Sequence, residues 1–190
     1  MKLYPLLVIM TCIAIFAMAA DSSQDGVSRT EIKLHHIENN ASHAPPDQTP
    51  TEFTEQEINA YFAPGKVKLP PGVQSVTFLA QSGILTASCN VDFDQVKAGR
   101  RSANPLLSLF SGVHDVVVVA QARGSGGQGL VEVQSVSVDG VEIPRFVLEL
   151  FVEKYLQPKY PNVGLESRFT LPDKIDTAIT GEHKLTVTQK

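Results

Sequence analysis

The sequence predicts an α+β fold in which a strongly curved antiparallel sheet wraps around one long central helix, with a short helix in front. Three observations lead to this prediction. Residues Pro144–Leu156 have a helical pattern that is apolar on nearly every side. The segments before and after them alternate between apolar and polar residues, as strands do. The expected order is a helix, four strands, the long helix and two or three strands, which is typical of α+β proteins.

The expected central helix has more apolar surface than one contact needs. At 100° per residue its apolar face consists of Val147, Leu148, Phe151, Val152 and Tyr155. The opposite, charged sector also contains Phe146, Leu150 and Leu156. At about 20 Å the helix is too short and too charged to span a bilayer. We therefore expect a curved sheet to enclose it, or a ligand or partner to cover its second face.

Residues 1–20 have the composition of a secretory signal peptide. An apolar run from Leu6 to Ala20 ends in Ala17-Met18-Ala19, which matches the A-x-A cleavage pattern. An uncleaved anchor is the alternative. Cleavage removes Cys12 and leaves Cys89 alone, so an intramolecular disulfide is excluded, and we expect a bacterial periplasmic or cell-surface protein. The net charge of −4 and the lack of a long basic run argue against nucleic-acid binding.

The mature chain divides into a tether and one domain. Residues 21–50 are rich in Ser, Asn, His, Asp and Pro, which predicts a disordered tether. Residues 51–190 have the length of a single domain. The domain opens with a helix at Thr54–Phe62. Thr54 and Glu57 form a capping box, Phe53 and Ile58 have the spacing of a hydrophobic staple, and Pro64-Gly65 ends the helix.

Alternating residues predict the strands. In Ile84–Asp94 the apolar side is made by every second residue from Leu85 to Phe93, whereas Val116–Val119 is apolar on both sides and predicts a strand covered on both faces. A change of phase near Gln134-Ser135 predicts a β-bulge. Asn104 and Pro105 start a short helix between two strands. The expected strands are 73–79, 84–94, 113–122, 130–138, 165–171, 175–180 and 183–188.

Catalytic patterns are weak, so we expect no enzyme, cofactor or metal site. Asp92 and Asp94 lie on one strand face and are the best candidates for a paired-acid or cation site, but the polar side of a strand explains them as well. His114 and Asp115 are adjacent on a strand and point to opposite faces. The Gly124–Gly129 segment lacks the Lys-Ser/Thr of a phosphate loop and is expected to be a hairpin.

The surplus apolar surface has two explanations. Either the sheet and the short helix simply enclose it, or an elongated groove between sheet and helix holds an acyl or isoprenoid chain. The expected ligand-binding residues are Phe78, Val91, Phe93, Val117, Val119, Phe146, Leu150, Phe151 and Phe169. An apolar segment beside two arginines could contact a membrane, although it could also pack on its own domain. The expected membrane-contact residues are Arg100, Arg101, Leu106, Leu107 and Phe110.

The order of elements resembles a known superfamily. The segment Thr54–Phe62 followed by strands, and the run Val136–Pro144 entering a long helix, are similar to small bacterial envelope domains of the tubular lipid-binding, BPI-like superfamily. The resemblance covers roughly residues 51–188. It implies a highly curved sheet around the long helix, lipid in the apolar interior and no catalysis.

Two functions follow as expectations. The first is an exported domain of the cell envelope that holds a lipid or another apolar small molecule, with possible peripheral membrane contact. The second is a periplasmic interaction or scaffold module with a solid core and no ligand. A continuous cavity beside Pro144–Leu156 would separate the two, because only the first function requires it.

Overall fold

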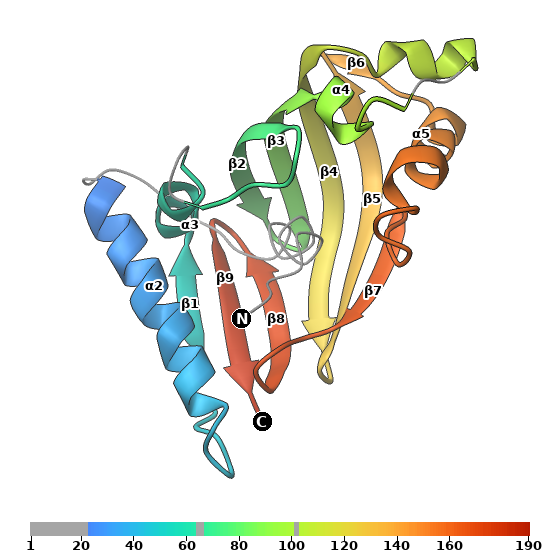
Figure 1. Ribbon diagram of the computed structural model, residues 1–190. Helices are drawn as coiled ribbons and strands as arrows, with labels where there is room; N and C mark the ends of the chain where they lie inside the picture. Colours follow the sequence, from blue (N-terminus) through green and yellow to red (C-terminus); the bar gives the residue numbers. More distant parts are fainter. Residues whose placement is uncertain (1–22, 64–66, 101–102) are drawn as a thin grey trace.

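A computed structural model describes residues 23–63, 67–100 and 103–190, so the expected signal peptide and Arg101 lie outside the described residues. The fold is α+β, with a nine-stranded antiparallel sheet that is neither closed nor strongly curled (Figure 1). Its strands are β1 (Thr51–Thr54), β2 (Val73–Gln81), β3 (Ile84–Asp92), β4 (Val113–Ser125), β5 (Gln128–Val138), β6 (Val141–Glu142), β7 (Glu166–Thr170), β8 (Ile175–Gly181) and β9 (Lys184–Gln189).

The long hairpin of β4 and β5 is the centre of the sheet. One edge of β4 pairs with β3 along Val113–Gln121 and then with β8 at Arg123 and Gly124. Beyond β3 lies β2, and beyond β8 lie β9 and β1. On the far edge, β5 pairs with β7 at its start and with β6 at its end. The sheet therefore branches from one hairpin, and β1 and β6 are strands that the sequence did not predict.

Local signals in the sequence explain several of these elements. The register of β4 against β5 jumps so that Gln134 has no partner, which confirms the predicted bulge. The capping box at Thr54 is confirmed at the start of α3 (Glu55–Tyr61). The side chain of Asn104 accepts a hydrogen bond from the Leu106 amide at the start of η2 (Pro105–Leu109), as expected of a cap.

The predicted long central helix is wrong. Residues Pro144–Leu156 instead form a seven-residue α-helix, α5 (Arg145–Phe151), which continues into a π-helical turn, η3 (Val152–Leu156). The Gln157 amide donates to the carbonyl of Val152, 2.9 Å away and five residues back, which marks the wider turn. Phe151 and Tyr155 are buried as expected, but Phe146 on the other side is 55% exposed. The helix therefore lies on a sheet face, and no sleeve of strands surrounds it.

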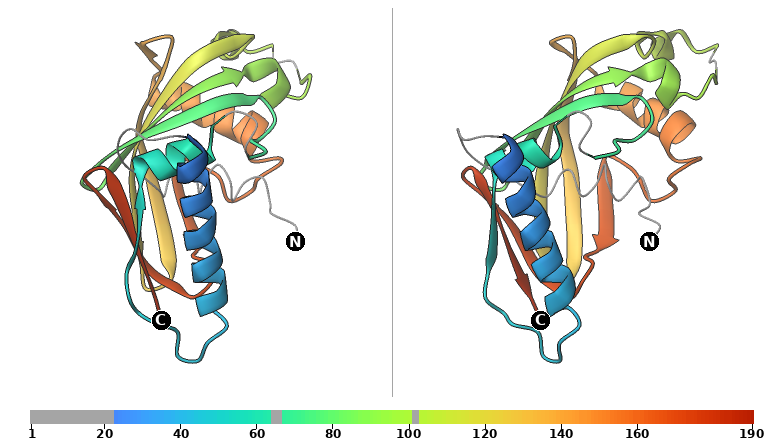
Figure 2. Two further views of the ribbon diagram at one scale, coloured as in Figure 1. Left: turned by 90° about the vertical axis from the view of Figure 1, so that its left-hand side faces the viewer. Right: turned by 60° about the vertical axis from the view of Figure 1, so that its left-hand side comes forward.

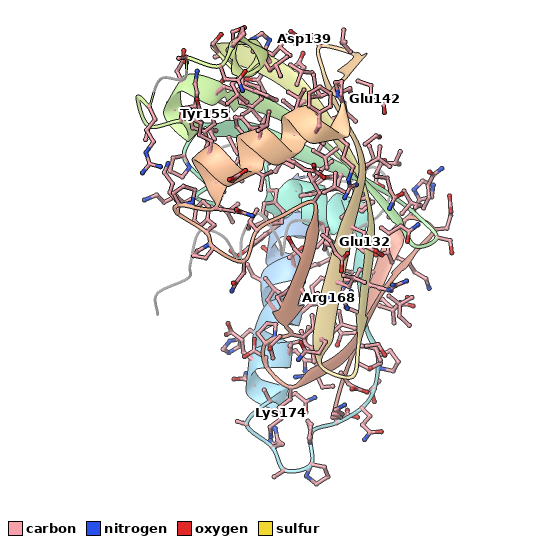
Figure 3. The ribbon with its side chains drawn as sticks, turned by 90° about the vertical axis from the view of Figure 1, so that its right-hand side faces the viewer. Glu132, Asp139, Glu142, Tyr155, Arg168 and Lys174 are labelled. Carbon is pink, nitrogen blue, oxygen red and sulfur yellow. The ribbon has the colours of Figure 1, made fainter. Side chains whose placement is uncertain are left out.

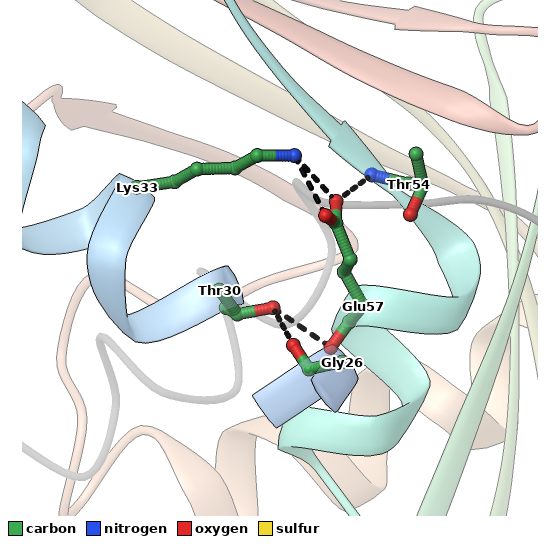
Figure 4. A network of polar contacts seen from close by, with 5 residues as sticks. All are labelled: Gly26, Thr30, Lys33, Thr54 and Glu57. Atoms are coloured by element: carbon green, nitrogen blue, oxygen red, sulfur yellow. Dashed lines mark hydrogen bonds and ion pairs between the residues drawn. The ribbon is translucent and has the colours of Figure 1, made fainter. Parts of the chain in front are cut away.

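The predicted disordered tether is also wrong over most of its length, because Ser23–Asn40 forms the helix α2. Figure 4 shows how polar groups attach α2 to α3. The Lys33 ammonium donates to both carboxylate oxygens of Glu57, at 2.8 and 2.7 Å, and the Thr30 hydroxyl donates to the Glu57 carbonyl at 2.8 Å. Since Glu57 also accepts from the Thr54 amide, one buried carboxylate joins the cap of α3 to α2.

Both helical groups pack on the same face of the sheet, at its two ends (Figure 2). The first core cluster joins α2 and α3 to β1, β2, β8 and β9, with Phe53, Ile58 and Leu185 among its most buried side chains. The second joins α5, η3 and η2 to β3, β4 and β5, around Phe110 and Tyr155. Val116 and Val118 of β4 point into these clusters, whereas the alternation turns Val117 and Val119 to the opposite face, where both side chains are half-buried. The expected cover of that second face is therefore only partial.

Candidate functional site: an apolar cavity between two core clusters

A cavity of about 280 Å³ lies where the two core clusters meet. Its floor is the inner face of β2, β3, β4 and β5, and its roof is α5, η3 and the segment that leads to β7. Side chains from both clusters line it, with Val76 and Phe78 from the first and Phe151 from the second. Its main apolar lining consists of Val76, Phe78, Ala87, Val91, Phe93, Phe110, Val116, Val118, Val131, Val136, Val138, Leu148, Phe151, Val152, Leu156 and Leu165.

Aromatic packing closes the α5 end of the cavity. The Phe151 ring lies 4.3 Å from the Phe110 ring and 5.6 Å from the Phe93 ring, measured between centroids. Tyr155, whose ring lies 5.3 Å from that of Phe151, is 1% exposed. Edge and tilted contacts of this kind add stability beyond the area that they bury. The three phenylalanine rings therefore pack together as one wall of the cavity.

Two residues of the lining mark where the cavity reaches solvent. Of the described residues that line the cavity, Pro71 and Lys159 alone are exposed. Lys159 lies just beyond η3, and its Nζ donates to the carbonyl of Val96 in α4 (Phe93–Val96) at 3.1 Å. This bond joins the segment after η3 to the end of α4 across the rim. Three segments therefore surround the opening: the one before β2, the end of α4 and the one after η3.

Cys89 lies in the cavity wall, between the two clusters. Burial raises the pKa of its thiol to about 12. The reactive form of cysteine is the thiolate, so this side chain is inert packing at neutral pH. The sequence predicted this placement from the alternation of β3, and the prediction is confirmed.

Four of the nine expected ligand-binding residues line the cavity, namely Phe78, Val91, Phe93 and Phe151. The other five do not. Val117 and Val119 point to the opposite face of β4, Phe146 is exposed, and Leu150 is half-buried against the second core cluster without lining the cavity. Phe169 covers Gly129 on the neighbouring strand, where an added Cβ would be 2.4 Å from its ring.

The expected membrane segment is only partly exposed. Leu107 and Phe110 are 4% and 2% exposed and belong to the second core cluster, so the expectation that they contact a membrane is wrong. Arg100 and Leu106 are exposed, as is Leu109, while Arg101 lies outside the described residues. Within the described chain, no helix is both long and apolar enough to cross a bilayer.

The acidic pair that was the best catalytic candidate has a structural role. Asp92 accepts hydrogen bonds from the amides of Asp94 and Gln95, so it caps the short helix α4. Asp94 pairs with Lys97 at 2.9 Å and accepts from the Gly112 amide. Across the described ranges, no group of three or more His, Cys, Asp or Glu side chains could hold a metal ion.

One acid–base pair was not predicted. His114 Nδ1 lies 2.6 Å from the Asp139 carboxylate, and its Nε2 lies 2.7 Å from the carbonyl of Ser111. The hydrogen bond to Asp139 is the main cause that raises the pKa of His114, and the same bond lowers the pKa of Asp139. Both acceptors are satisfied only when both ring nitrogens carry protons. The pair therefore fastens the segment after η2 to the β5–β6 turn, and we assign it no catalytic role.

Comparisons with models of known families, with curated proteins and with solved structures give no match to this chain. The resemblance to the tubular lipid-binding superfamily therefore stays an expectation from the sequence. The architecture that it implied, a strongly curved sheet around a long helix, is not the one found. The case for a function has to come from the cavity itself.

Proposed function

We propose that this chain is an exported, non-catalytic protein that holds a small apolar ligand, such as an acyl or isoprenoid chain, in the cavity between its two core clusters. The observation that carries the proposal is the cavity of about 280 Å³ with an almost wholly apolar lining. Protein interiors rarely contain voids larger than a water molecule. Ligand pockets begin at about 300 Å³, so this cavity lies close to their lower limit. A space of this size is suited to one hydrocarbon chain.

Desolvation is the driving force in this proposal. Apolar cavities of moderate size stay dry and take up apolar guests, because water gains too few hydrogen bonds inside them. Each methylene that leaves water contributes about 0.8 kcal/mol. The described lining includes Ser167, but its hydroxyl is already engaged with the backbone of Gly164. The body of the cavity thus favours hydrocarbon and offers little to a polar ligand.

The rival function, an interaction or scaffold module, requires a solid core. The cavity counts against a solid core at the junction of the clusters. The enzyme alternative loses its support because Asp92 and Asp94 are engaged as caps and ion-pair partners. The carrier proposal is therefore the one that the geometry supports best.

The first prediction uses two adjacent valines of β4 as a matched pair. Val118 lines the cavity and Val117 points to the other sheet face. Val118→Trp should fill the cavity and abolish the binding of decanol, whereas Val117→Trp should bind decanol like the unmodified protein. Isothermal titration calorimetry of the full chain measures both affinities.

Thermal unfolding provides the folding control for this pair, since overpacking a core costs about 1–3 kcal/mol. If Val118→Trp does not fold, Ala87→Leu adds a smaller obstruction from the neighbouring strand, where Ala87 also lines the cavity. The carrier function is contradicted if decanol binds equally to the folded cavity variant and to Val117→Trp, or if the unmodified protein binds none.

A further inference from the structure

The polar groups of the cavity lining come mainly from one short segment. Lys159, Tyr160, Gly164 and Ser167 all lie between the end of η3 and the middle of β7. The rest of the lining is apolar apart from the inert thiol of Cys89. The lining is thus apolar except at this segment, and of the four residues only Lys159 is exposed.

Among the described residues of the lining, Lys159 alone carries a charge. Its contact with the Val96 carbonyl uses one of the three donors of an ammonium group and holds Nζ at the rim. Because the side chain is exposed, the ammonium stays hydrated and needs no buried counter-ion. Nothing in the packing of the core requires a cation at this place.

We propose that the ligand is a single-chain amphiphile with an anionic head group, a carboxylate or a phosphate, and that the head group binds Lys159 while the chain occupies the cavity. This inference rests on the proposed function. Hydrogen bonds between ionised partners are about twice as strong as neutral ones, and a compact ammonium suits both kinds of oxyanion. The small volume argues against a lipid with two chains.

The experiment measures the affinities of decanoate, decyl phosphate and decanol by calorimetry in a phosphate-free buffer near neutral pH. These probes share one chain and differ in the head group. We expect the unmodified protein to bind at least one anion more tightly than decanol. Lys159→Gln should weaken the binding of that anion about threefold, the size expected of an exposed ion pair, and leave decanol unchanged. Lys159→Arg should keep most of the affinity.

Lys174 offers a matched control. Its Nζ also donates to a backbone carbonyl of a distant segment, that of His43 at 2.7 Å, and it is exposed. Figure 3 shows Lys174 at the end of the molecule opposite Tyr155 and the α5 helix. Lys174→Gln should therefore change none of the three affinities, and it removes the same charge and the same type of bond.

The outcomes separate this inference from the proposed function. If decanol binds but neither anion binds more tightly, or if Lys159→Gln leaves the anions unaffected, the assignment of Lys159 is overturned and the apolar carrier stands. If none of the three probes binds, both fail. If Lys159→Gln weakens only decanoate, the head group is a carboxylate, and if it weakens only decyl phosphate, the head group is a phosphate.

Discussion

Two helical regions cover the same face of the sheet, and they are attached to it in different ways. At one end, α2 and α3 are joined by the ion pair between half-buried Lys33 and buried Glu57, and a glycine, Gly26, comes so close to α3 that an added Cβ would lie 2.8 Å from the Cβ of Ala60. At the other end, α5 and η3 rest on aromatic and aliphatic contacts around Phe151. The cavity lies beside the second region.

The difference shows how a fold can hold an apolar space open. Polar bonds have fixed lengths and directions, and a glycine allows close approach, so the α2–α3 contact is tight and specific. Apolar contacts are non-directional and tolerate several spacings. A region that depends on them can accept a guest chain, provided that its wall is rigid. The Phe93, Phe110 and Phe151 cluster provides such a wall.

The largest effect should come from breaking the aromatic wall. Phe151→Ala removes a buried ring that contacts Phe93, Phe110 and Tyr155, and it should lower the free energy of unfolding by about 3–5 kcal/mol. The matched control is Phe146→Ala on the same helix, which removes a ring that is 55% exposed and should change that free energy by less than about 0.5 kcal/mol. Urea denaturation measures both. Equal losses would show that α5 does not pack as described.

A smaller effect should come from breaking the polar attachment of α2. Lys33→Met leaves the buried Glu57 carboxylate without its cation and should lower the free energy of unfolding by about 2 kcal/mol. Lys184 pairs with Glu52 at the same 2.7 Å but on the surface, so Lys184→Met should cost less than about 1 kcal/mol. A cost for Lys33→Met no larger than that of the control would contradict the role of the pair.

The pH dependence of this difference is a further check. Burial acts to raise the pKa of Glu57, but the bonds from Lys33 and Thr54 together outweigh it, so the pKa is lowered in the folded state. The pair therefore stabilises the fold above the ordinary carboxyl pKa of about 4.3, and this contribution is lost as the pH falls through the lowered value. The gap between the unmodified protein and Lys33→Met should shrink under acid conditions.

Local sequence patterns predicted most of the strands, the cap at Thr54 and the bulge at Gln134, because each depends on neighbours within a few residues. Long-range contacts decided the rest. Asn40 donates to the Gln189 side chain across 149 positions, and such a bond cannot be read from the polar composition of residues 21–50. A usable signal was present all the same, since Thr30, Leu34, Ile37 and Asn40 recur at helical spacing.

The residues that line the cavity could be predicted only where apolar and polar residues alternate along a strand, because that pattern shows which side chains face the core. Val91 follows from the pattern of β3, and the same alternation predicted Phe93, although that residue begins α4. Val116–Val119 has no polar member to show which valines point inward. The helix misled the prediction because Phe146 and Leu150 suggested a second buried face, whereas Phe146 is exposed and Leu150 is only half-buried against the second core cluster. Lys159 has no local pattern at all, because its place at the opening depends on the course of the chain after η3.

The most direct test of the central claim, that an apolar cavity between the two core clusters accepts a hydrocarbon chain, is the alkylation rate of Cys89 in the folded full chain. The rate is followed by mass spectrometry of the peptide that contains this residue. Because the thiol lies in the cavity wall with its pKa raised to about 12, we expect slow reaction with iodoacetamide and a further decrease when decanol is added. Val118→Trp should abolish the effect of decanol. A Cys89 that reacts as fast as in the denatured chain, or at a rate that decanol does not change, would contradict the claim.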